Sequence, residues 1–122
     1  MLTFASWYQP HNWRGRLIRI SAQAGRGVSK AQYPWNVVPC LVPDWTLVKQ
    51  FKSGAITEAQ YTSAYLRMLR QRDHDVSAWL ATLTPSDDLT FLCHEPDGAF
   101  CHRRLVADLV RRRRPDIEVS LR

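Results

Sequence analysis

Apolar and polar positions along the chain follow two different periods, which together predict strands interleaved with helices. Four short segments are rich in apolar, β-branched or aromatic residues, as strands are. They are residues 2–8, 16–24, 88–94 and 116–121. Between the second of these segments and the next helical pattern, residues 25–43 contain two glycines and three prolines. This composition predicts a long loop, and long loops in compact domains are often functional.

The helical patterns carry recognisable start signals. Asp44 is placed as an N-cap for a helix over 44–52, and Thr57 with Gln60 forms a capping-box pattern at the start of the next helix. That second helix continues to about Arg72, and Asp75 is placed to cap a third one. Residues 101–114 predict a fourth helix, which Pro115 ends.

Strands that alternate with helices predict an α/β domain with a mainly parallel sheet of about four strands in three layers. A chain of 122 residues has the length of a single domain, here residues 1–122. In such sheets, ligands bind beyond the carboxyl ends of the strands. The segment 91–104 crosses from a predicted strand end to a helix start, so it is the predicted site.

Charge and cysteine usage narrow the classes of partner. The net charge is +6, residues 1–43 contain no acidic residue, and residues 101–122 contain seven arginines. This distribution favours a polyanion or a phosphorylated ligand, although a solvated surface would also explain it. No apolar stretch is long enough for a membrane span, and no signal peptide is recognisable. Three cysteines are no disulfide framework, so reduced thiols in a cytoplasmic protein are expected.

The segment FLCHEPDGAFCHRRLVADL (91–109) contains the candidate chemistry. The start of a helix offers unpaired N–H groups and a positive dipole end, which suit a phosphate and lower the pKa of a thiol such as Cys101. Arg103 and Arg104 would add cationic forks, with Arg103 the better candidate because Arg104 lies near Asp108. The segment's potential acid/base groups are Glu95 and His102.

Simpler explanations of these residues remain open. Cys93 at the end of an apolar strand can be a buried small hydrophobic residue, His102 a structural histidine, and Glu95 a helix cap. Residues 97–98 form an Asp-Gly turn signal. Zinc is disfavoured because adjacent Cys-His pairs would point in different directions, and no metal or cofactor is predicted. The Cys-x5-Arg loop of cysteine phosphatases, the P-loop and the Rossmann glycine fingerprint are absent.

The stretch LCHEPDGAFCHRRLVADLV (92–110) resembles the C-terminal signature of the domain of unknown function 488 family, in a short subgroup found in bacteria and phages. Members of that family have Cys-x-Glu at a strand end and Cys-His-Arg opening a helix, matched here by Cys93, Glu95 and residues 101–103. The resemblance implies a Rossmann-like α/β fold and supplies no activity. Many members also carry an acidic motif after an early strand, where this chain retains Ser21 and Arg26 as its polar residues.

Three functional hypotheses follow. The leading one is a pocket at Cys93–Arg104 that binds a phosphorylated ligand, either a nucleotide or nucleic acid, in DNA modification or phage–host conflict. Aromatic residues near the N-terminal cations would form its roof, Trp13 and Trp35 among them. The second is a cysteine-dependent enzyme on such a substrate, with Cys93 or Cys101 as nucleophile. The third is a protein–protein interaction module or inhibitor.

Overall fold

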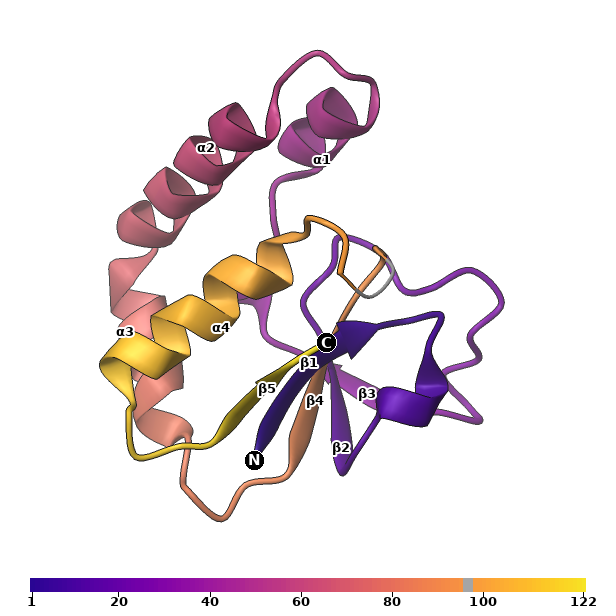
Figure 1. The fold of residues 1–122 in the computed structure, drawn as a ribbon, viewed down its shortest axis with the longest axis vertical. Coiled ribbons are helices and arrows are strands. Elements are labelled where there is room, and N and C mark those ends of the chain that lie inside the picture. The colour runs from indigo at the N-terminus through magenta and orange to yellow at the C-terminus, as the bar shows by residue number, and fades with distance from the viewer. Residues whose placement is uncertain (96–97) are drawn as a thin grey trace.

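The sheet of this protein is entirely parallel. The computed structural model describes residues 1–95 and 98–122, and within them five strands pair in the order β3-β2-β4-β1-β5. The strands are β1 (Leu2–Ser6), β2 (Arg16–Arg19), β3 (Trp35–Val37), β4 (Leu89–Cys93) and β5 (Val119–Leu121). The two central strands, β4 and β1, are buried along their whole length. The predicted Rossmann-like α/β class is therefore confirmed (Figure 1).

The helices begin close to the predicted positions. They are α1 (Trp45–Lys52), α2 (Glu58–Gln71), α3 (Asp73–Thr82) and α4 (His102–Arg113), with short 3-10 turns at Pro10–Asn12 and Pro39–Leu41. The predicted capping box is present: the Gln60 backbone N–H donates to Thr57 Oγ1 (3.1 Å) and the Thr57 N–H donates to Gln60 Oε1 (2.8 Å). Asp75 caps nothing, because α3 begins two residues earlier.

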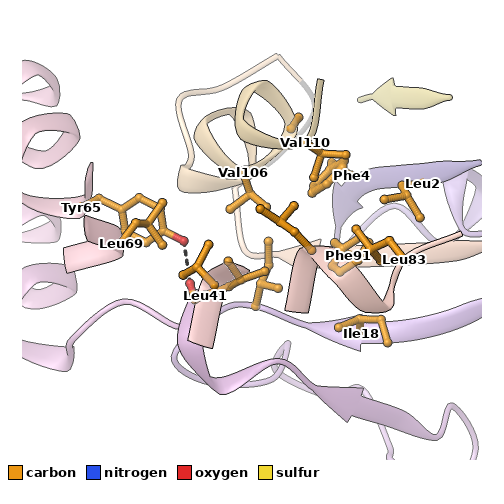
Figure 2. Packing of buried hydrophobic residues seen from close by; sticks show 14 of the residues in the cluster. Leu2, Phe4, Ile18, Leu41, Tyr65, Leu69, Leu83, Phe91, Val106 and Val110 are labelled. Carbon is orange, nitrogen blue, oxygen red and sulfur yellow. Dashed lines mark hydrogen bonds between the residues drawn. The ribbon is translucent and has the colours of Figure 1, made fainter. Parts of the chain in front are cut away.

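The helices bury one face of the sheet in a continuous apolar core. Phe4 of β1 stacks on Phe91 of β4 with ring centroids 4.9 Å apart, and Val106 and Val110 of α4 are fully buried in the same cluster (Figure 2). Each such side chain contributes about 1.5–3 kcal/mol when it leaves water. Figure 1 shows α2, α3 and α4 gathered on one side of the molecule.

Irregular segments, not helices, cover the opposite face. There Trp7 lies edge-on to Trp13 and to Trp35, with centroids 6.2 and 5.1 Å away. These rings pack with Ala5, Leu17 and Leu92, which point away from the helical face. The third layer of the domain is thus built from the segments that flank β2.

The structure corrects the prediction of an uninterrupted loop over 25–43. Residues 35–37 form the edge strand β3, which pairs with Leu17–Arg19 of β2, and a 3-10 turn follows it. A three-residue edge strand has too few positions to show a period of two, so the pattern could not reveal it. The predicted strands 2–8 and 16–24 are also shorter than expected, ending at Ser6 and Arg19. Within the described residues, no helix combines the length and apolar character that crossing a bilayer requires.

Candidate active site at the carboxyl ends of β2 and β4

A small pocket of about 50 Å³, partly open to solvent, lies at the carboxyl ends of two neighbouring strands. Its floor is formed by the end of β4, the start of α4 and the residues that follow β2, and its walls by α1 and α2. Cys93, Glu95, Cys101 and His102 all line it. These four residues therefore border one concavity at the strand ends. Of the predicted turn between them, residues 96–97 lie outside the described part of the chain.

A disulfide closes the floor of the pocket. It joins Cys93, the last residue of β4, to Cys101, the N-cap of α4, and the two residues are 3% and 5% exposed. The expectation of three reduced thiols is wrong for this pair, and Cys40 alone of the three cysteines is free. An odd cysteine count carries no information on which two sulfurs a strand–turn–helix unit brings together.

His102 lies directly against both sulfurs. Its Nδ1 is 3.4 Å from Cys93 Sγ and 3.6 Å from Cys101 Sγ, while Nε2 is 2.7 Å from the carbonyl oxygen of Ile20. A carbonyl can only accept a hydrogen bond, so Nε2 carries the proton and Nδ1 presents a lone pair to the sulfurs. Burial lowers the pKa of His102 to about 4, although the bond to Ile20 opposes this shift. The imidazole is neutral near pH 7.

The three donor atoms form a compact cluster. Cys93 Sγ, Cys101 Sγ and His102 Nδ1 all lie within 4.8 Å of one another. Zinc was disfavoured from the sequence because the two Cys-His pairs would point in different directions. In the structure three of these four residues, Cys93, Cys101 and His102, do converge. His94 faces away, with Nε2 2.8 Å from the carbonyl oxygen of Gln23. Cysteine thiolates and neutral imidazole are the donors of zinc sites, so the cluster can hold a metal when its thiols are reduced.

Aromatic side chains from α1, α2 and the segment before α4 also line the pocket. Phe51 of α1, Tyr61 of α2 and Phe100 lie with ring centroids between 5.1 and 5.7 Å of one another. Burial raises the pKa of the Tyr61 hydroxyl, with a smaller contribution from the charge of Glu95, so this hydroxyl stays protonated. Trp45 at the start of α1 also lines the pocket, although it is 46% exposed. A planar ligand could stack against such a wall.

Polar groups at the pocket are few. Lys52 at the end of α1 supplies an exposed cation, and Glu95 a half-buried carboxylate. Burial lowers the pKa of His94, whose Nδ1 accepts a hydrogen bond from the Tyr8 hydroxyl at 3.4 Å. Ser21 is buried at the edge of the floor, where its hydroxyl accepts from Trp7 Nε1 (2.9 Å).

The two arginines expected to bind an anion lie elsewhere. Arg103 is 0% exposed and donates to the carbonyl oxygens of Glu95 (2.7 Å) and Arg122 (3.3 Å), and it does not line the pocket. It occupies the same helical face as the buried Val106 and Val110. Arg104 donates to the carbonyl of Ala99 (3.3 Å), also outside the pocket lining.

The N-terminal residues predicted as the roof do not line the pocket either. Trp13 and Trp35 belong to the aromatic cluster on the other face of the sheet, and Trp13 Nε1 donates to the carbonyl of Ser6 (2.9 Å). Arg26 is exposed, and its backbone N–H donates to the Tyr8 hydroxyl (3.1 Å). The pocket walls come instead from α1 and α2, through residues that the sequence interpretation did not single out: Trp45, Phe51, Lys52 and Tyr61. Their helical spacing indicated a core face and gave no sign of a ligand.

Comparison with known proteins gives one match. The model of the DUF488-N3a family, described as the active DUF488-N3 subclade, matches residues 2–114. The match covers every site residue described above. No curated protein and no solved structure gives a significant match.

Proposed function

This chain belongs to the DUF488-N3a family, the active DUF488-N3 subclade, and we propose that it is an enzyme acting on a ligand that contains a nucleobase. Its reactive centre is the cluster of Cys93, Cys101 and His102. One observation carries the proposal: two sulfurs and an unprotonated imidazole nitrogen meet on the floor of a pocket with an aromatic wall. Reactive groups at the base of a largely apolar concavity are typical of enzyme active sites. The description of the subclade as active supports the same class.

The pocket lining supports a base-containing ligand. Trp45 offers an exposed ring and Phe51 a half-buried one, whereas the buried Tyr61 stacks on Tyr65 and supports them from behind. Stacking a base on an aromatic side chain contributes about 1–3 kcal/mol. A phosphate on the same ligand would lie between Lys52 and the first backbone N–H groups of α4. These groups replace Arg103 and Arg104 as the predicted anion ligands.

The reduced form of the cysteine pair is the active one. A sulfur held in a disulfide is neither a thiolate nucleophile nor a metal ligand. The unprotonated Nδ1 of His102 faces both sulfurs. There it can accept the proton of a thiol, or bind the same electrophile as the two sulfurs. Activity should therefore depend on a reductant, and on both cysteines.

The test combines turnover with matched variants. Reduced protein is incubated with nucleosides, nucleotides and short single-stranded oligonucleotides, and loss of each compound is followed by mass spectrometry. We expect turnover by the wild type and by Cys40→Ser, and a loss of at least about 100-fold in Cys93→Ser and Cys101→Ser, the scale on which a missing reactive group acts. Full activity in both cluster variants would refute the assignment of these residues as the reactive centre. If the protein bound a nucleotide without turning it over, it would be a nucleotide-binding domain, and the proposal that it is an enzyme would be refuted.

A further inference from the structure

The sulfurs and the imidazole nitrogen at the pocket floor are arranged as ligands of one metal ion. We propose that, with its thiols reduced, the protein binds one zinc ion through Cys93 Sγ, Cys101 Sγ and His102 Nδ1. The binding of zinc follows from the geometry of these three residues. A catalytic use of the metal rests on the proposed function.

The distances from the histidine to the sulfurs fit a tetrahedral ion. Zinc lies at about 2.3 Å from a thiolate and about 2.0–2.1 Å from an imidazole nitrogen, which places the two donors about 3.6 Å apart at a tetrahedral angle. The observed separations from His102 Nδ1 are 3.4 Å to Cys93 Sγ and 3.6 Å to Cys101 Sγ. In the disulfide-bonded form the imidazole nitrogen thus already lies at donor spacing from both sulfurs, and the movement needed to bind a metal falls on the sulfurs.

The backbone leaves room for the two sulfurs to separate around a metal. The Cα atoms of Cys93 and Cys101 are 7.2 Å apart, whereas most disulfides hold theirs at about 4.4–6.8 Å. Two thiolates on one tetrahedral zinc lie about 3.8 Å apart, a separation that side-chain rotation can supply. Each cysteine also comes from a regular element, one at the end of β4 and one at the N-cap of α4.

The second nitrogen of His102 is held as in a metal site. Nε2–H donates to the carbonyl of Ile20 at 2.7 Å, which fixes both the ring orientation and the tautomer. Histidine ligands almost always have such an outer partner, which keeps the other nitrogen free for the metal. Packing against the Tyr65 ring, with centroids 5.2 Å apart, further restricts the imidazole.

Charge and burial favour zinc at this position over two free thiolates. All three residues are buried, and an isolated buried thiolate is costly because it loses its hydration. Two thiolates and a divalent cation are together neutral, and Cys101 also stands at the positive end of the α4 dipole. Two soft sulfur donors select zinc over magnesium or calcium, which prefer oxygen ligands.

The site has three protein ligands and borders the pocket. Such a set, with a fourth position for water or substrate, is the arrangement of catalytic zinc, whereas structural zinc has four protein ligands. Since all three residues line the pocket, a ligand stacked on the aromatic wall can reach the open position. Zinc there would act as a Lewis acid or lower the pKa of a bound water.

The test measures metal binding directly. Protein reduced with a phosphine and stripped of metal is titrated anaerobically with zinc against a chromophoric chelator, and in parallel with cobalt, whose visible spectrum reports thiolate ligation and tetrahedral geometry. We expect one equivalent of either ion. Cys93→Ser and Cys101→Ser should bind zinc at least about 100-fold more weakly, the upper end of the loss that even an outer partner causes. Cys40→Ser, whose thiol lies outside the cluster, should bind like the wild type.

Oxidised wild-type protein serves as a control that needs no substitution. Its sulfurs are bonded to each other, so it should bind no zinc at the cluster, and restoring binding with reductant would support the proposal. Absence of binding by the folded, reduced wild type would overturn it, as would unchanged affinity in both cluster variants. If the protein binds zinc but binds none of the nucleosides or nucleotides tested, the metal site is supported and the proposed function is refuted. Full turnover by the metal-free reduced protein would support the proposed function and refute the catalytic use of the metal.

Discussion

Replacing Arg103 tests whether this arginine stabilises the fold or binds a ligand. Its guanidinium group is fully buried and donates to the carbonyls of Glu95 at 2.7 Å and Arg122 at 3.3 Å. In Arg103→Met the side chain keeps most of its apolar stem, but both carbonyls lose this donor. We expect the variant to lose stability and to keep its affinity for any ligand of the pocket, because Arg103 does not line it.

The size of the effect follows from the contacts. A hydrogen bond from a charged donor contributes about 1.5–3 kcal/mol, so two such bonds contribute about 3–6 kcal/mol, with the longer one at the low end of its range. Removing the cost of dehydrating a buried charge offsets part of this. The free energy of unfolding should therefore fall by about 2–4 kcal/mol.

Urea denaturation of both proteins, with the disulfide in the same oxidation state, measures this difference. The midpoint should shift with little change in slope, because the surface exposed on unfolding is nearly the same. Arg104→Met is the matched control: Arg104 is only partly buried and makes a 3.3 Å bond to Ala99, so less than about 1 kcal/mol is expected. The reasoning is refuted if Arg103→Met unfolds within about 0.5 kcal/mol of the wild type while ligand affinity falls.

Three further predictions concern the core, a turn and the surface. Tyr65→Phe removes a buried 2.6 Å hydrogen bond to the Leu41 carbonyl (Figure 2) and should cost about 1–3 kcal/mol in urea denaturation, whereas Tyr33→Phe at an exposed position should cost less than about 0.5 kcal/mol. Gly15→Ala should lower the melting temperature far more than Gly54→Ala. Both glycines have positive φ, but a Cβ on Gly15 would lie 1.9 Å from a backbone oxygen and one on Gly54 would meet nothing within 4 Å. If oligonucleotides bind the basic residues of segments 1–43 and 101–122 through about three to five phosphates, a plot of log K against log salt concentration should have a slope of roughly −2 to −4. No binding at low salt would exclude a nucleic acid partner.

Local signals in the sequence determined the order of elements and the place of the site. Thr57 and Gln60 satisfy each other's backbone N–H groups within one helical turn, so the start of α2 could be predicted without knowledge of its surroundings. The strand–turn–helix pattern around Cys93 and Cys101, combined with the strand-end rule, placed both cysteines at one pocket. Each of these inferences depends on neighbours that are close in the chain.

Tertiary structure alone decided which side chains meet in that pocket. Phe51 and Tyr61 form its wall because α1 and α2 fold over the strand ends, and periodicity cannot distinguish such rings from core residues. Arg103 is buried where carbonyls on both sides of α4, 8 and 19 residues away in the chain, accept its hydrogen bonds. The sulfurs of Cys93 and Cys101 and the lone pair of His102 converge only because the Ile20 carbonyl, 82 residues away in the chain, holds the imidazole in one tautomer and orientation. A hydrogen bond of this kind depends on a close approach in space, which residue order does not encode locally.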